Sequence, residues 1–152
     1  MKVKHFMITD VICVTKETTV KRLLETLVTH KIGGVPVVDD ENTLIGMITD
    51  GDVLRYLQPK GRGIYDMYSL VIFSEKENLD QKLNYALNHH VDRVMRKKDI
   101  KRVRPDDDLE EALAIFSRHH FKKIPVVNDE RKVVGVLSRG DMIRYITTQL
   151  IE

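Results

Sequence analysis

The chain has 152 residues, of which 42% are hydrophobic and 32% are charged, and its formal net charge is +2. This length suits one compact unit that buries a core without disulfides, and the single cysteine, Cys13, excludes an internal disulfide and a zinc site built on several thiolates. No apolar run approaches the roughly 18 residues of a membrane helix and no signal-peptide pattern is present, so we expect a cytoplasmic protein.

Residues 1–56 predict one compact unit. It begins with a helical turn at 3–7 and a β-branched strand at 11–14. A helix follows, capped by Thr18 or Thr19 and ending near His30. Its apolar residues have the spacing of one buried helical face: Val20, Leu23, Leu24 and Leu27.

A hairpin and a second helix complete this unit. The first strand, 35–38, contains Pro36, which we expect at a position where no ladder N–H is needed. A polar turn at 39–43 leads to a second strand at 44–48, and a helix covers 50–56. The predicted order is therefore β-α-β-β-α.

The turn from the last strand into the last helix has the pattern Gly-φ-φ-(Ser/Thr)-x-x-Asp, with Thr49 and Asp52 at its polar positions. A hydroxyl followed three residues later by an acid is typical of a helix N-cap, in which both side chains bind free amides. Such a corner also suits a bound anion, because free amides and the positive end of the helix dipole point outward. The pattern alone leaves both interpretations open.

The whole unit is repeated at 91–152, where Ser138 and Asp141 occupy the same polar positions. The helical stripe returns as Leu109, Ala112, Leu113 and Phe116, and the proline strand returns at 124–127. Two copies of a unit too small to close its own core should pack against each other. We therefore predict an α+β fold of two β-α-β-β-α repeats, packed pseudo-symmetrically through their sheets.

Residues 57–90 form an insert with no copy elsewhere in the chain. Its Gly61–Gly63 stretch is loop-like, and its apolar run at 67–73 fits a helix or a strand equally well. A helical stripe follows: Leu79, Leu83, Ala86 and Leu87. We expect this partly helical insert to pack over an open edge or a dimer face.

These elements, found twice in the same order around a Val-Pro-Val-Val or Ile-Pro-Val-Val strand, resemble the CBS domain, and the pair resembles a Bateman module. The resemblance covers the chain outside the insert. It implies clefts between the repeats that bind adenosine ligands such as AMP, ADP, ATP, S-adenosylmethionine or cyclic di-AMP. It also implies a homodimer that regulates another protein and is not an enzyme.

The resemblance implies that the hydroxyl residue lies by the ribose-phosphate and that the Asp binds the ribose hydroxyls. Thr49 and Asp52 would serve one cleft, and Ser138 and Asp141 the other. The implied adenine walls are the residues before each proline strand and those leading into the first helix of each repeat. These are Ile32, Gly33, Phe121, Lys122, Lys123, Val14, Thr15, Lys16, Val103 and Arg104, and His120 borders the same segment.

The two corners differ at one position, which is Asp50 in the first copy and Arg139 in the second. An acid suits a helix N-terminus, whereas a cation there opposes the helix dipole unless an anion shares the site. We therefore expect the cleft of Ser138, Arg139 and Asp141 to bind phosphate more tightly. The alternative is that Arg139 extends into solvent or pairs with an acid.

Two other features allow more than one interpretation. The cationic run 93–104 is typical of a solvated face, with attraction of polyphosphate as the alternative and nucleic acid last, because no aromatic residues are interleaved. The paired histidines at 89–90 and 119–120 diverge on a helix, so we expect no metal site. Cys13 is expected in the core.

No catalytic series, Walker loop or HExxH motif is present. Together with the resemblance to CBS domains, this absence implies a non-catalytic sensor of adenine nucleotides. A structural dimerisation module with vestigial clefts and a weak nucleotide hydrolase are the alternatives.

Overall fold

The structure is a computed structural model that describes residues 1–58 and 75–151, so the predicted loop at 61–63 and the apolar run at 67–73 lie outside the described residues. The described helices are η1 (Val3–His5), α1 (Val20–His30), α2 (Asp50–Leu57), α4 (Glu75–Leu87), η2 (Val91–Arg93), α5 (Leu109–Arg118) and α6 (Arg139–Leu150). The strands are β1 (Gly34–Val38), β2 (Leu44–Thr49), β3 (Lys123–Val127) and β4 (Val133–Ser138). The predicted α+β class is confirmed.

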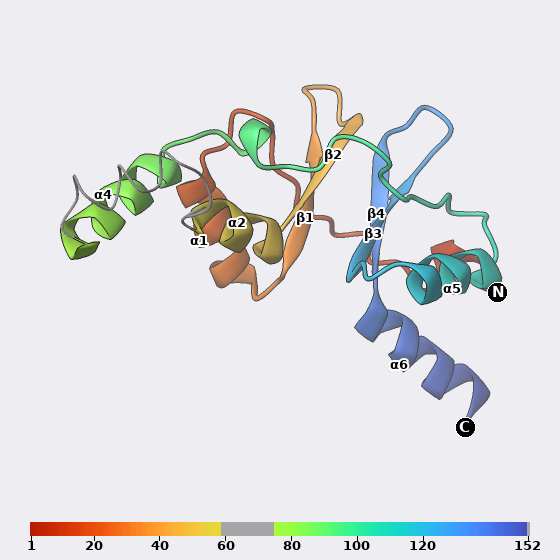
Figure 1. Cartoon of the computed structure of the whole chain (residues 1–152). Coiled ribbons are helices and arrows are strands. Elements are labelled where there is room, and N and C mark those ends of the chain that lie inside the picture. The colour runs from red at the N-terminus through yellow and green to blue at the C-terminus, as the bar shows by residue number, and fades with distance from the viewer. Residues whose placement is uncertain (59–74, 152) are drawn as a thin grey trace.

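Two antiparallel hairpins, β1–β2 and β3–β4, lie side by side at the centre of the molecule, and helices flank them on either side (Figure 1). The hairpin tips are bonded to each other. The Leu44 amide donates to the Arg131 carbonyl at 3.0 Å, and the Val133 amide donates to the Asn42 carbonyl at 3.1 Å. A buried cluster is shared between the hairpins: Val38, Leu44, Val127 and Val133. The predicted packing of the two repeats through their sheets is confirmed.

The strand predicted at 11–14 is wrong, since it is reduced to one parallel bridge between Val14 and Val37. The Val14 amide donates to the Pro36 carbonyl at 3.1 Å, and the Val14 carbonyl accepts from the Val38 amide at 2.9 Å. The next rung of a parallel ladder would need an N–H from Pro36, which has none. Pro36 therefore lies where no ladder N–H is used, as predicted, and for the same reason the ladder stops there.

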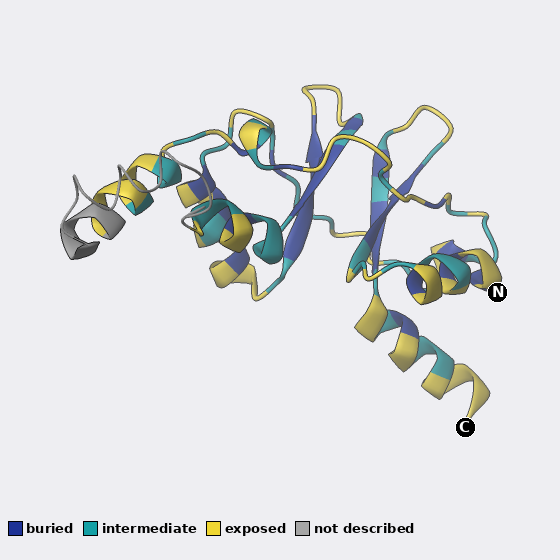
Figure 2. Cartoon of the chain, in the orientation of Figure 1, coloured by how far each residue is buried: buried dark blue, intermediate teal, exposed yellow. Residues whose placement is uncertain are grey.

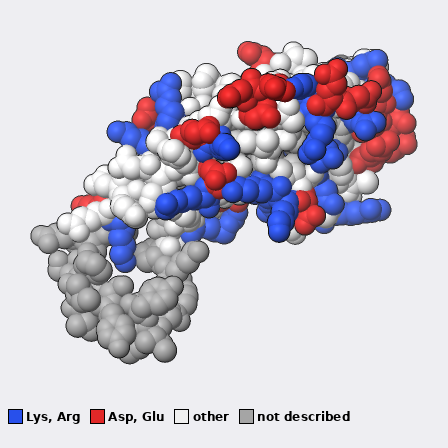
Figure 3. All heavy atoms as spheres, turned by 90° about the horizontal axis from the view of Figure 1, so that it is seen from above, with Lys and Arg blue, Asp and Glu red and all other residues white. Residues whose placement is uncertain are grey.

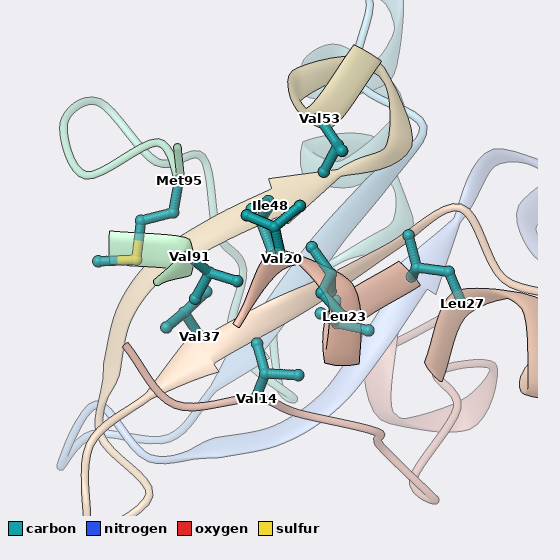
Figure 4. Packing of buried hydrophobic residues seen from close by; sticks show 10 residues of the cluster. Val14, Val20, Leu23, Leu27, Val37, Ile48, Val53, Val91 and Met95 are labelled. Carbon is teal, nitrogen blue, oxygen red and sulfur yellow. The ribbon is translucent and has the colours of Figure 1, made fainter. Parts of the chain in front are cut away.

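Each repeat receives its first segment from the other half of the chain. Val3 of η1 is fully buried in the core of the second repeat, and its amide donates to the Asp107 carbonyl at 2.9 Å. Val91 and Met95 pack in the core of the first repeat, where Figure 4 shows them beside Val37 and Ile48. The predicted boundaries, 1–56 and 91–152, therefore describe the repeats of the sequence. They do not separate the two cores, because each core contains residues from the other half of the chain.

These crossing segments explain the glycine that opens each corner pattern. A Cβ on Gly46 would lie 2.8 Å from the Arg96 carbonyl oxygen. A Cβ on Gly135 would lie 2.6 Å from the Met7 sulfur. At Gly46 the added Cβ would meet another backbone, so glycine is needed there for the close approach. At Gly135 it would meet the flexible end of the Met7 side chain first, with the Ile8 carbonyl oxygen 3.1 Å away.

The helices cover the hairpins with the apolar faces that the sequence predicts, with one exception, and their outer faces are exposed (Figure 2). The exception is Leu113 of α5, which was predicted on the buried stripe and is 40% exposed. Thr19, one of the two predicted caps, accepts the Arg22 amide at 3.1 Å through its hydroxyl. The insert helix α4 packs against α1 and α2, and Leu87 at its end contacts the core of the first repeat. Among the described helices, none has the length and apolar content needed to cross a membrane.

Candidate functional site

The corner at the start of α2 is closed by its own side chains. Thr49 and Asp52 form a full capping box, with the Asp52 amide 3.2 Å from the Thr49 hydroxyl and the Thr49 amide 3.0 Å from the Asp52 carboxylate. The Asp50 amide donates to the Gly33 carbonyl at 2.8 Å, and the Gly51 amide donates to the Asp50 carboxylate at 2.6 Å. The expectation of free amides is therefore wrong at this corner, because the Asp50 and Asp52 carboxylates, the Thr49 hydroxyl and the Gly33 carbonyl accept their hydrogen bonds.

The corner at the start of α6 is more open. The Ser138 hydroxyl accepts from the Asp141 amide at 3.0 Å and donates to the Asp141 carboxylate at 2.6 Å. In the predicted capping box the Asp141 carboxylate would accept from the Ser138 backbone amide instead. The Arg139 amide donates to the Lys122 carbonyl at 3.1 Å. In the first corner the Asp50 carboxylate accepts from the Gly51 amide, but Arg139, its counterpart, has no acceptor group in its side chain. In the described part of the chain the Gly140 amide therefore has no acceptor.

Each corner Asp also binds an arginine one turn later. Asp52 accepts from Arg55 at 2.8 Å, and Asp141 accepts from Arg144. The side chains of Asp52 and Asp141 are only 16% and 21% exposed. A carboxylate has about four acceptor positions, so these contacts leave Asp52 able to accept further hydrogen bonds.

A cavity of about 230 Å³, here named the α2 cavity, opens beside the first corner. Six of the predicted site residues line it: Thr49, Asp52, His120, Phe121, Lys122 and Lys123. The first two come from the first repeat and the other four come from the segment that leads into β3. The cavity is therefore shared by both repeats, which the sequence left open.

The start of α2 adds Asp50, Gly51 and Arg55 to the lining. Sequence reasoning did not place the remaining four lining residues: Met47, Arg96, Ile100 and Lys101. Arg96 and Met47 exchange backbone hydrogen bonds of 2.8 and 3.0 Å along the edge of β2. The Arg96 guanidinium lies over the Phe121 ring, 5.1 Å from its centroid. The cationic run 93–104 signalled Arg96 and Lys101, but only the crossing of η2 into the first repeat brings them to this cavity.

A second cavity of about 310 Å³, the inter-corner cavity, lies between the two helix starts. Its lining is Gly33, Gly34, Thr49, Lys122, Lys123, Ser138, Arg139 and Gly140. Lys122 and Lys123 line both cavities. Burial lowers the pKa of the Lys123 ammonium, and the attraction of Asp141 opposes this shift only in part. A positive charge is therefore held, at a desolvation cost, where the two cavities meet.

The remaining predicted residues do not line these two cavities. Val14 and Val103 are buried in the repeat cores, and Ile32 packs against the first of them. The other members lie in the loops before α1 and α5 or at the second corner: Thr15, Lys16, Arg104 and Asp141. Their contact with a ligand stays a prediction.

Cys13 is half-buried beside the cluster shared by the hairpins, and burial raises the pKa of its thiol, as expected for a residue of the core.

A model of the CBS domain matches residues 3–59 and 91–148. The chain belongs to the CBS domain family. The CBS domain-containing protein CBSX2 of Arabidopsis thaliana, a chloroplastic protein, is 31% identical over 135 residues, which are 86% of this chain and 56% of CBSX2. Inosine-5'-monophosphate dehydrogenase of Methanocaldococcus jannaschii is 26% identical over 94% of this chain, which spans only 23% of that enzyme.

Solved CBS structures have the same architecture. The crystal structure of CBSX2 in complex with AMP aligns with a TM-score of 0.73 at 28% identity and covers 97% of this chain and 96% of that one. Protein MJ1225 of M. jannaschii aligns with a TM-score of 0.80 at 23% identity, over all of this chain and 52% of that one. The likeness to MJ1225 is one of fold.

Proposed function

We propose that this CBS pair binds an adenine nucleotide, with AMP, ADP and ATP as candidates, in the α2 cavity. The observation that carries the proposal is that one cavity joins an apolar surface, a largely buried carboxylate and several cations. The bound AMP of CBSX2, a protein that matches this chain over nearly its full length, supports the same ligand class.

Each part of such a ligand has a chemically suitable neighbour. The base would contact the apolar surface of Met47, Ile100 and Phe121. The ribose hydroxyls would donate to Asp52, whose carboxylate keeps free acceptor positions. The phosphate would lie against Lys122 and Lys123, where the two cavities meet.

The two corners differ in which backbone amides are free to bind phosphate. All amides of the α2 corner are occupied, so side chains must supply its contacts to phosphate. The Gly140 amide and Arg139 lie across the inter-corner cavity. From the sequence we expected tighter phosphate binding at Ser138, Arg139 and Asp141. We now propose that this second corner supplies phosphate contacts to a ligand bound in the α2 cavity.

We propose that the module is regulatory and non-catalytic. A ligand between Thr49 of one repeat and Lys122 of the other contacts both halves, so it favours whichever arrangement of the repeats it binds more tightly. Homodimerisation and a regulated partner protein belong to the same proposal. Exposed apolar side chains on the outer helices would suit such contacts: Val28 at 76%, Leu54 at 68% and Ile143 at 64% exposure.

Calorimetric titration with AMP tests this proposal. We expect saturable binding to the wild type, and binding about tenfold weaker to Lys122→Gln, because one charged contact to phosphate is lost. Lys98→Gln, which removes the same charge outside both cavities, should bind as the wild type does. If AMP, ADP and ATP all fail to bind, the proposal is wrong and the alternative of a structural module with vestigial clefts is favoured.

Incubation with ATP and Mg²⁺ separates the sensor from the weak hydrolase. The sensor should leave ATP intact, while turnover that is lost in Lys122→Gln would contradict the non-catalytic role.

A further inference from the structure

A third cavity, of about 550 Å³, lies over the hairpin tips and is here named the tip cavity. Lys97 and Arg102 reach it from the segment after η2, and Arg131 reaches it from the turn between β3 and β4. The acid in its lining is Asp99, so the cations outnumber the acids three to one. None of these charged residues lines the α2 cavity or the inter-corner cavity.

The cations of the tip cavity are only partly neutralised. Lys97 pairs with Asp92 at 3.1 Å. Arg102 and Arg131 make no ion pair with any residue that the structure describes. Figure 3 looks down on this face and shows basic and acidic side chains interspersed across it. The cations of the tip cavity are therefore a local cluster and not part of a uniformly basic surface.

The internal repeat provides a control for this cluster. The counterparts of Lys97, Arg102 and Arg131 in the other copy are Thr9, Cys13 and Asn42, and none is a cation. The fold of the repeat therefore does not require cations at these three positions, although the counterpart of the lining residue Thr43 is Lys132. The comparison is sharpest at Arg131, whose backbone has a left-handed φ of 65°, matching 64° at Asn42. Asn adopts that conformation at lower cost than Arg, so the backbone does not favour the arginine.

We propose that the tip cavity binds a compact chain of linked phosphoryl groups. Three cations lining one cavity suit a ligand with several adjacent negative charges better than a single phosphate. Such a chain could be a free inorganic polyphosphate. It could also be the phosphate tail of a nucleotide, because Ile100 lines both the tip cavity and the α2 cavity.

Calorimetric titration with sodium tripolyphosphate tests this inference, with Arg131→Asn as the variant. Asn is the residue that the other copy carries at this position, so the variant should fold, and its melting temperature checks that it does. We expect saturable binding to the wild type and about tenfold weaker binding to Arg131→Asn, because a charged contact is lost. Lys98→Gln removes an equal charge from the segment after η2, outside the cavity, and should leave the affinity within about twofold.

Two further arms distinguish the sources of the phosphoryl groups. Unchanged tripolyphosphate affinity in AMP-saturated protein supports a separate site for free polyphosphate. A loss of affinity in Arg131→Asn for ATP but not for AMP supports the nucleotide tail. Failure of tripolyphosphate to bind the wild type overturns the inference, and so does an equal loss in Arg131→Asn and Lys98→Gln. AMP binding is measured separately, so the nucleotide proposal can fail or hold independently.

Discussion

Replacing Lys123 by Met should change stability and nucleotide affinity in opposite directions. Burial lowers the pKa of Lys123 from its ordinary value of 10.5, so the folded protein holds this charge less readily than the unfolded chain does. The resulting cost to stability is present at neutral pH and disappears as the pH rises above 10.5, where both states are neutral. Met retains most of the apolar side chain and removes the cost.

The stability gain should be small, because Lys123 is only half-buried and is attracted by Asp141. Solvent screening limits the gain to less than about 1 kcal/mol, which corresponds to at most about 2–4 °C in melting temperature for a chain of this size. The effect on AMP should be larger. Loss of a charged contact to phosphate weakens binding about tenfold.

Thermal melts with and without AMP, together with calorimetry, measure both effects on Lys123→Met and on Lys98→Met as the control. The melting temperature of Lys123→Met should exceed that of the wild type at pH ~7, and the difference should shrink near the ordinary lysine pKa. A lower melting temperature for Lys123→Met would refute the reasoning about burial. An AMP affinity equal to that of Lys98→Met would refute the role of Lys123 in binding.

Three further predictions concern stability. Gly46→Ala should lower the free energy of unfolding in urea by about 1–3 kcal/mol, because its Cβ would meet the Arg96 carbonyl at 2.8 Å. Gly51→Ala is the control. Its Cβ would meet only the flexible Arg55 side chain, so it should show no such loss. Thr49→Ala should cost about 1 kcal/mol in the same assay through loss of the α2 cap, and an unchanged value would contradict the capping box. Burial and Arg93 lower the pKa of His89, so the wild-type melting temperature should fall as the pH drops below 6.5, and His89→Gln, which cannot gain the proton, should show a smaller fall. Equal pH profiles for the two proteins would exclude His89 as the cause.

Local patterns predicted the elements correctly where short-range physics decides them. The apolar spacing of Val20, Leu23 and Leu27 defines α1, and the hydroxyl of Thr19 caps it, as the sequence indicates. The repeat then predicts the same elements in the second copy. The β-branched composition of residues 11–14 favours a strand locally. The prediction failed because the ladder would require an N–H from Pro36, a residue more than twenty positions away.

The site was predictable in its corners and in the wall before β3, but not in the wall formed after η2. Thr49, Asp52, Phe121, Lys122 and Lys123 follow from the repeated pattern and its resemblance to CBS domains, and the structure gathers them around one cavity. Arg96, Ile100 and Lys101 join them only because η2 crosses into the other repeat, a long-range exchange with no local signal. The occupancy of the corner amides was equally hidden, since it depends on the Asp50 side chain and the Gly33 carbonyl.

A two-dimensional amide NMR titration with AMP tests the central claim most directly, because it shows where the ligand binds as well as whether it binds. The account predicts the largest shifts around Thr49 and Gly51, in 96–101 and in 120–123, with Gly140 moving if the phosphate reaches the second corner. Absence of shifts at saturating AMP, or shifts confined to α1 and α4, would contradict it.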